Sequence, residues 1–231
     1  PPADLPDTGM TLLQVDDTLL ALGVLAAEWR RKFDIPVIAV TGSVGKTTTK
    51  EMTASILSQL GPRLKTPENY NNEIGVPLTL LSLTEQHKTA VCELAMRGPG
   101  QIRYLTELAA PTIGIITNVG ISHLGLLSSE TAIASAKAEL LESMAPDTWA
   151  ILPVESKHYP FLQKKAAHLN ILTFGPHRGR ICAENPRPAE NGLSFMLWLP
   201  AHKTGGHGDW HEVTLPLPGR HNLPNALAAA A

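Results

Sequence analysis

The stretch VIAVTGSVGKTTTK, residues 37–50, decides the fold. Residues 37–40 are continuously apolar, as in a strand that is buried on both faces. A glycine turn follows, and Lys46-Thr47 opens a run that reads as a helix from about residue 46 to residue 60, ending at Gly61-Pro62. Strand, glycine turn and helix in this order are typical of a loop that binds phosphate through backbone N–H groups and the helix dipole.

The loop departs from the usual phosphate-loop template, G-x-x-x-x-G-K-[ST]. Counted back from Gly45-Lys46-Thr47, the first glycine of the template falls on Val40, whereas the glycine present is Gly42. In a phosphate loop the lysine reaches the β- and γ-phosphates, and the Thr47 hydroxyl binds Mg²⁺. The alternative is an ordinary glycine turn with a lysine at a helix end. The loop by itself does not separate kinases, GTPases, ATPases and ligases.

The rest of the chain repeats the alternation of strands and helices. Further strands are predicted at residues 89–94, 112–117, 149–152 and 171–174, and helices at 101–109, 129–143 and 157–169. This order predicts an α/β fold with a mostly parallel sheet flanked by helices. From residue 180 onward, short β-like runs separated by Pro, Gly and Asn predict a small antiparallel subregion.

A helix is also predicted before the first strand, at residues 16–32, with Asp16 or Asp17 as its cap. Its helical period places five apolar side chains on one stripe, namely Leu19, Leu22, Leu25, Ala26 and Trp29. The chain begins with proline and stops inside NALAAAA, so we expect it to be a piece of a longer protein.

Composition narrows the function classes. The 231 residues are 43% hydrophobic and carry a formal charge of -2, which argues against a nucleic-acid binder. No apolar run approaches the roughly 20 residues that span a bilayer, so no membrane partner is expected. The two cysteines, Cys92 and Cys182, form no CxxC pair, which predicts a cytoplasmic protein.

Three further segments carry candidate site residues. Glu93 ends a predicted strand, where open α/β sheets place ligands, and a carboxylate there would hold Mg²⁺ unless it simply faces solvent. His123 follows another strand end and could share a site with Glu93, while Lys137 lies in the next helix. A lone His or Lys is usually structural or solvated.

Amide side chains gather in two places. TPENYNNEIGV, residues 66–76, suits recognition of sugar or amide groups, although its Asx turns could be satisfied locally. Near the end, Asn222 and Asn225 are spaced one helical turn apart and could read the edge of an adenine. Asn222 could equally be a helix N-cap.

Taken in order, TGSVGKTTTKEM, NNEIGVPLTLL, ELAMRGPGQI, ITNVGISHL, AKAEL and GRHNLPNALAAA resemble the Mur ligase family, ATP-dependent amide-forming enzymes of bacterial cell-wall synthesis. The family has a TGxxGKT loop, so the glycine at position 42 fits the resemblance. The resemblance to the family extends over about residues 35–231. TTTKEM, NNEIGVPLTLL and MRGPGQI look most like the family member that adds D-alanyl-D-alanine to the UDP-MurNAc-tripeptide.

The resemblance implies roles for individual residues. ATP phosphates would be bound by Gly42, Ser43, Val44, Gly45, Lys46, Thr47 and Thr48, and adenine by Asn222 and Asn225. Two Mg²⁺ ions would be held by Thr47, Glu93, His123 and Lys137, the last as a carbamylated lysine. The resemblance implies that the catalytic residues are Lys46, Glu93, His123 and Lys137. The UDP-muramyl substrate would meet Thr66, Asn69, Asn71 and Asn72.

The resemblance also implies the organisation of the chain and its chemistry. Residues 1–33 would be the trailing segment of an N-terminal UDP-sugar domain, and residues 34–231 the central ATP-binding domain, with a C-terminal domain absent. We expect the full enzyme to be a cytoplasmic monomer that transfers the γ-phosphoryl group of ATP to a carboxylate, after which D-Ala-D-Ala attacks the acyl phosphate. The chain alone is expected not to ligate.

Two alternatives stay open at this point. One is another amide ligase of the same fold, of the folylpolyglutamate- or cyanophycin-synthetase type. The other is a phosphate-loop nucleotide-binding module without ligase activity, although a guanine-reading [NT]KxD motif is missing from the sequence.

Overall fold

The computed structural model describes residues 12–120, 129–201 and 207–231. Six parallel strands form the main sheet in the order β2-β3-β1-β4-β5-β6, so β1 lies in the interior of the sheet. The strands are β1 (Val37–Thr41), β2 (Arg63–Lys65), β3 (Thr89–Glu93), β4 (Ile113–Ile116), β5 (Trp149–Pro153) and β6 (Asn170–Phe174). The predicted parallel α/β sheet is confirmed, with β2 as an edge strand that the sequence pattern did not reveal.

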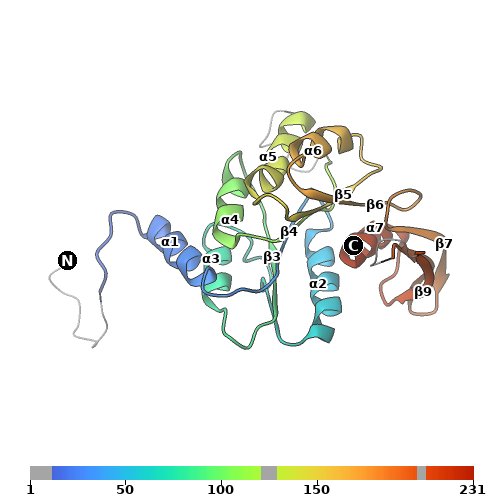
Figure 1. Cartoon of the computed structure of the whole chain (residues 1–231), viewed down its shortest axis with the longest axis horizontal. Coiled ribbons are helices and arrows are strands. Elements are labelled where there is room, and N and C mark those ends of the chain that lie inside the picture. The colour runs from blue at the N-terminus through green and yellow to red at the C-terminus, as the bar shows by residue number, and fades with distance from the viewer. Residues whose placement is uncertain (1–11, 121–128, 202–206) are drawn as a thin grey trace.

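Helices cover both faces of this sheet (Figure 1). One face carries α1 (Thr18–Arg30), α3 (Gly75–Leu81), α4 (Gln101–Ala109), α5 (Glu130–Ser143) and α6 (Tyr159–Lys165). The other face carries α2 (Lys46–Leu57) and α7 (Leu223–Ala230). The short 3₁₀ helices η1 (Ser58–Leu60) and η2 (Arg220–Asn222) follow α2 and precede α7.

The pleat of β1 divides the interior into two hydrophobic cores. Val37 and Ala39 belong to the core under α1, α3, α4, α5 and α6. Ile38 and Val40 point the other way, into the core shared with α2 and α7. Alternate side chains of a strand point to opposite faces, so a strand with helices on both sides must be apolar throughout. All five residues of β1 are buried, as the continuous apolar run predicted.

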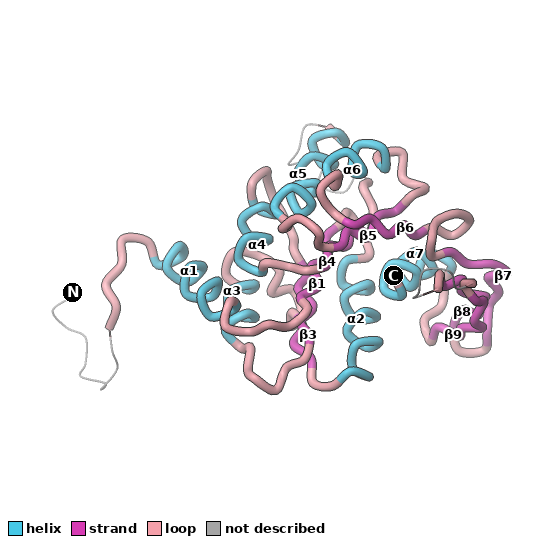
Figure 2. The backbone as a smooth tube through the Cα atoms, viewed as in Figure 1, coloured by secondary structure: helices cyan, strands magenta, loops and turns pink. Residues whose placement is uncertain are grey.

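A second, antiparallel sheet packs beside α2 and α7, as Figure 2 shows. It consists of β7 (Cys182–Ala189), β8 (Gly192–Leu199) and β9 (Asp209–Leu215), in the order β7-β8-β9. Phe195 and Leu197 of β8 enter the core shared with α7. The predicted antiparallel subregion is therefore confirmed, and it closes the α7 side of the molecule.

Helix α1 begins where predicted but buries only part of the predicted stripe. Asp17 caps it, accepting hydrogen bonds from the N–H groups of residues 19 and 20 at 2.8 and 3.0 Å. Leu19 and Leu25 are exposed, whereas Gly23 and Ala26 are buried. A Cβ atom at Gly23 would lie 2.1 Å from the Tyr104 hydroxyl of α4. The close approach of α4 therefore selects a small residue at position 23. Of the predicted stripe, Ala26 and Trp29 do face the core, whereas the predicted burial of Leu19 and Leu25 is wrong.

The parallel sheet brings the carboxyl ends of β1, β3 and β4 to one edge. β1 ends in the glycine loop, β3 ends at Glu93, and β4 leads into Thr117 and Asn118. Within the described ranges, no helix combines the length and apolar character needed to cross a bilayer.

Candidate active site

The glycine loop between β1 and α2 depends on two glycines. Gly42 has φ +153° and Gly45 has φ +80°, both in the region that favours glycine. A Cβ atom at Gly42 would lie 1.9 Å from Thr117 Oγ1, and one at Gly45 would lie 2.2 Å from Asn225 Oδ1. The positive φ angles and the close neighbours together explain why glycine stands at these positions.

The end of β4 fixes the shape of the loop. Asn118 Oδ1 accepts hydrogen bonds from the N–H groups of Ser43 and Val44 at 3.1 and 3.0 Å. Ser43 Oγ donates to the Gly120 carbonyl at 3.0 Å, and Thr117 Oγ1 donates to the Val44 carbonyl at 2.7 Å. The loop is therefore held in one conformation by residues about 75 positions later in the chain. Sequence reasoning assigned no role to Thr117 or Gly120.

The first turn of α2 offers a binding site for an anion. The N–H groups of Lys46, Thr47 and Thr48 lie in this turn, where a helix supplies no backbone partner. The Lys46 ammonium folds back over the loop and donates to the Gly42 carbonyl at 2.9 Å. Burial lowers the pKa of Lys46, and the charge of Glu93 opposes that effect. This combination of free N–H groups and a half-buried ammonium suits phosphate oxygens.

Glu93 lies at the centre of the polar cluster. Its carboxylate is 2% exposed at the carboxyl end of β3. Oε2 accepts a hydrogen bond from Thr47 Oγ1 at 2.9 Å, and Oε1 accepts one from Asn71 Nδ2 at 2.9 Å. The solvent-facing alternative for Glu93 is therefore wrong. A buried carboxylate next to a hydroxyl presents the oxygen ligands that Mg²⁺ prefers, so these residues fit the ion.

Lys137 is buried in α5, with 1% of its surface exposed. Burial, and to a smaller extent the nearby charge of Lys46, lower its pKa from 10.5 to about 7. The solvated alternative for Lys137 is therefore wrong, and a large share of the amine is uncharged at neutral pH. His123, predicted to lie near Glu93, falls outside the described residues.

Among the described residues, no three or more His, Cys, Asp and Glu side chains are grouped so that they could hold a metal. The expected ligand set is of a different kind. It combines a hydroxyl, a single carboxylate and a lysine with His123, which lies in the undescribed range 121–128.

Both predicted asparagines of the C-terminal segment line a pocket beside the glycine loop. The pocket has a volume of about 710 Å³ and extends from Val44 and Gly45 to the ends of β5 and β6. Asn222 is the N-cap residue of α7, as the alternative predicted, but its side chain makes no capping bond, because Nδ2 donates to the Pro218 carbonyl at 2.8 Å. Asn225 Oδ1 lies 3.5 Å from Thr49 Oγ1. The pocket is large enough for a nucleoside.

Residues 66–76, here called the amide-rich loop, line a smaller pocket of about 210 Å³ together with residues that follow β3. Asn69, Asn71 and Asn72 line it together with Arg97. The side-chain Oδ1 of Asn72 is used locally, because it accepts hydrogen bonds from the N–H groups of residues 74 and 75. Thr66, in contrast, is fully buried and outside the pocket lining. Its hydroxyl instead accepts a hydrogen bond from the Glu93 N–H at 2.9 Å.

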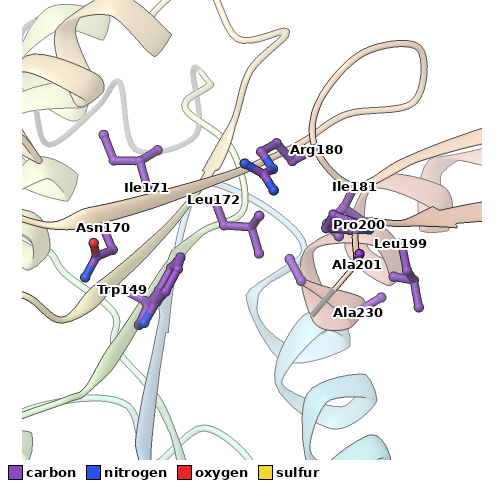
Figure 3. Close-up of a pocket in the computed structure, with 11 residues that line it drawn as sticks. Trp149, Asn170, Ile171, Leu172, Arg180, Ile181, Leu199, Pro200, Ala201 and Ala230 are labelled. Atoms are coloured by element: carbon purple, nitrogen blue, oxygen red, sulfur yellow. The ribbon is translucent and has the colours of Figure 1, made fainter. Parts of the chain in front are cut away.

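A separate pocket of about 580 Å³ lies at the amino ends of β5 and β6 (Figure 3). Trp149, Asn170 and Arg180 line it, together with apolar residues of β6, β8 and α7 such as Leu172, Leu199 and Ala230. None of the predicted site residues contributes to this lining. Apart from His123, which the described ranges do not include, the predicted site residues lie at or near the carboxyl edge of the sheet, around Glu93 and the glycine loop.

Sequence reasoning missed Lys50, one helical turn after Lys46. Its side chain is fully buried, and its ammonium lies 3.9 Å from Glu93 Oε2. The one sequence signal for it is the spacing in KTTTK: Lys50 follows Lys46 by four residues, which places both lysines on the same face of α2.

Comparison with known proteins assigns a family to this arrangement. Residues 40–231 match the family model described as the Mur ligase middle domain. The UDP-N-acetylmuramoyl-tripeptide–D-alanyl-D-alanine ligase of Synechocystis is 46% identical over 225 residues, which are 96% of this chain and 46% of the relative. The chain spans about half the length of the curated relatives it matches.

Solved structures agree with the sequence comparison. A crystal structure of MurF from Acinetobacter baumannii is similar with a TM-score of 0.88 and 37% identity, covering 98% of this chain and 49% of that one. MurF ligase from Thermotoga maritima, solved in complex with ADP, is similar with a TM-score of 0.79 and 28% identity. That alignment covers 95% of this chain and 51% of the other.

Proposed function

Because the chain belongs to the Mur ligase family, we propose that residues 34–231 are the central ATP-binding domain of a ligase that joins D-alanyl-D-alanine to UDP-MurNAc-tripeptide. Residues 1–33 would then be the trailing segment of an N-terminal domain that binds the UDP-sugar, and a C-terminal domain would complete the enzyme. One observation carries the proposal. The Glu93 carboxylate is bonded at once to Thr47 of the glycine loop and to Asn71 of the amide-rich loop. A single carboxylate thus links the two surfaces on which the substrates would meet.

ATP would occupy the pocket that runs from the glycine loop to Asn222 and Asn225. Its phosphates would lie against residues 42–48, where the N–H groups of the first turn of α2 are free and Lys46 supplies a positive charge. The adenine would lie between the asparagines and the ends of β5 and β6. An ADP complex of the similar Thermotoga maritima enzyme supports nucleotide as the ligand.

Two Mg²⁺ ions would be held around Glu93. Thr47 and Glu93 would supply hydroxyl and carboxylate oxygens to one ion, and His123 with carbamylated Lys137 would bind the second. When bound, these ions neutralise the charge that builds up on a transferring phosphoryl group. Thr47 orients the Glu93 carboxylate from one side and Asn71 orients it from the other.

The environment of Lys137 favours its carbamylation. With a pKa of about 7, about half of the amine is uncharged at neutral pH and keeps its lone pair. The nitrogen forms a bond to the carbon of CO₂ and loses one proton, which converts a cation-forming side chain into a carbamate anion. An anion at this position would no longer repel a cation and would be attracted to Lys46.

The residues of the chain would serve an acyl-phosphate reaction. A carboxylate oxygen of the tripeptide forms a bond to the γ-phosphorus of ATP, while the bond from that phosphorus to the β,γ-bridging oxygen breaks and ADP leaves. The amine of D-Ala-D-Ala then attacks the acyl carbon, loses a proton and displaces phosphate. Lys46 and the N–H groups of the loop would hold the phosphoryl oxygens during this transfer. No nucleophilic side chain is required.

The proposal extends to the setting of the reaction. Such an enzyme would work in the cytoplasm, where ATP is available, with two small substrates and neither nucleic acid nor membrane as partner. We expect it to be monomeric and expect the 231-residue chain alone not to ligate, because the proposed substrate contacts are divided among three domains.

The test uses the full-length enzyme and two pairs of substrates. UDP-MurNAc-tripeptide with D-Ala-D-Ala should support ATP-dependent formation of an amide, detected by mass spectrometry, whereas folate with glutamate should not. Lys46→Ala should abolish the first activity. Amide formation only with folate and glutamate would refute the proposed substrate, and full activity of Lys46→Ala would refute the proposed ATP site.

A further inference from the structure

Lys50 is the largest fully buried side chain among the described residues, together with Lys137. It lies on α2, one turn beyond Lys46, and none of its surface reaches solvent. Burying an ammonium group is costly unless its charge and its three donors find partners. The partners of Lys50 therefore indicate what it is there to hold.

Those partners belong to two different parts of the proposed active site. The Lys50 ammonium donates to the Thr66 carbonyl at 2.9 Å and to the Glu68 carbonyl at 3.4 Å, both at the start of the amide-rich loop. It also lies 3.9 Å from Glu93 Oε2 and 3.2 Å from Glu51 Oε1. Thus one buried cation joins the start of the loop to the carboxylate that is proposed to hold Mg²⁺.

Two further hydrogen bonds join the loop directly to Glu93. The Thr66 hydroxyl accepts from the Glu93 N–H, and Asn71 Nδ2 donates to Glu93 Oε1. Glu68 itself has φ +41°, an unfavourable conformation for a residue with a side chain. Its carbonyl is one of the two that Lys50 holds. The ammonium therefore stabilises a strained turn directly beside the cation site.

We propose that Lys50 is a positioning residue that couples binding of the UDP-muramyl substrate at residues 66–72 to binding of the cation at Glu93. The inference rests on the proposed function, because that function supplies the two ligands. When substrate binding shifts the loop, Lys50 transmits the movement of the Thr66 and Glu68 carbonyls to the Glu93 carboxylate. By linkage, the cation strengthens substrate binding by the same factor.

The positive charge of Lys50 by itself would have a different effect on cation binding than the proposed coupling has. A positive charge 3.9 Å from Glu93 opposes a second cation there, so its removal should not weaken cation binding in the absence of substrate. Coupling, in contrast, depends on the contacts of Lys50 with the loop and should fall when they are lost. The two effects can therefore be separated by measuring cation affinity with and without substrate.

The experiment uses the full-length enzyme without ATP, so that no turnover occurs. Electron paramagnetic resonance of free Mn²⁺ gives its dissociation constant with and without saturating UDP-MurNAc-tripeptide, and the ratio of the two constants is the coupling factor. Lys50→Met should lower the wild-type factor about fivefold or more, since coupling between sites is typically about 5- to 150-fold. Lys65→Met is the matched control, because Lys65 also pairs with Glu51 but is partly exposed on β2. It should keep the wild-type factor.

Each outcome decides a separate point. A wild-type enzyme that binds no Mn²⁺ without ATP overturns the coupling, because no cation is then held at Glu93 for the substrate to act on, while the amide-formation assay decides the proposed function. A wild-type factor of one, or an unchanged factor in Lys50→Met, overturns the role of Lys50 and leaves the proposed function standing. Circular dichroism establishes whether Lys50→Met is folded. If it is not, the wild-type factor alone still tests the coupling, and a factor of one overturns it.

Discussion

Lys137→Met should make the protein more stable while removing a residue of the proposed cation site. The wild-type side chain is 1% exposed, and its pKa falls from 10.5 to about 7, first because of burial and then because of Lys46. Methionine has a similar length and no charge, so it fills the same space without a desolvation penalty. A functional residue that costs stability is expected where a site needs an unusual protonation state.

The magnitude follows from the displacement of the pKa. Between pH 7 and 10.5 the unfolded chain binds a proton at Lys137 that the folded chain does not, so the free energy of unfolding rises with pH in this window. The rise is about 1.4 kcal/mol per pH unit, which amounts to at most about 5 kcal/mol over the window. Below pH 7 the Lys137 side chain is charged in the folded and the unfolded chain, so the folded state bears the full free-energy cost of burying that charge. The advantage of Lys137→Met should therefore be largest at pH 7 and should shrink by about 3 kcal/mol at pH 9.5.

Urea denaturation of the 231-residue chain measures this difference at pH 7, 8, 9 and 9.5 in CO₂-free buffer. Lys164→Met, an exposed position on α6, is the control and should show no pH-dependent difference from wild type. Added bicarbonate should stabilise the wild type and leave Lys137→Met unchanged, because only a lysine amine can form the carbamate. A difference between Lys137→Met and wild type that stays constant from pH 7 to 9.5 would refute the argument that burial lowers this pKa.

Three further substitutions test the loop and the cation site in the full-length enzyme. Gly45→Ala, which places a Cβ atom 2.2 Å from Asn225 Oδ1 at φ +80°, should weaken ADP binding at least about tenfold by calorimetry; unchanged ADP affinity would count against the loop. Thr47→Val removes the hydroxyl 2.9 Å from Glu93 Oε2 and should raise the Mg²⁺ concentration for half-maximal activity about tenfold or more; an unaltered Mg²⁺ requirement would exclude Thr47 from the cation site. Lys46→Ala should lower kcat about a hundredfold or more in steady-state assays, and a change confined to KM would show that Lys46 contributes to binding only.

Much of the fold could be predicted because its signals are local. The continuous apolar run at residues 37–40, the glycine turn and the alternation of strands and helices define a parallel sheet without knowledge of contacts. β2 escaped prediction because it has only three residues, two of them basic, at the edge of the sheet. The buried stripe of α1 could be predicted only in part, since it also depends on how closely α4 approaches Gly23.

Residues of the proposed site likewise differ in whether a local sequence signal or only a tertiary contact reveals them. Glu93 could be located because it ends a strand, and parallel strands bring their carboxyl ends to one edge. Lys50 could not, because a lysine is normally exposed and only tertiary contacts reveal that this one is buried between Thr66 and Glu93. The separate position of Thr66, inside the protein and outside the pocket lining, was hidden from sequence for the same reason.

The path of the phosphoryl group is the central claim, and an isotope experiment tests it most directly. UDP-MurNAc-tripeptide labelled with ¹⁸O in the reacting carboxylate is incubated with the full-length enzyme, ATP and D-Ala-D-Ala, and the released phosphate is analysed by mass spectrometry. An acyl-phosphate intermediate transfers one carboxylate oxygen to phosphorus, so we expect one ¹⁸O atom in each phosphate. Phosphate free of ¹⁸O, released together with the amide product, would contradict phosphoryl transfer to the carboxylate.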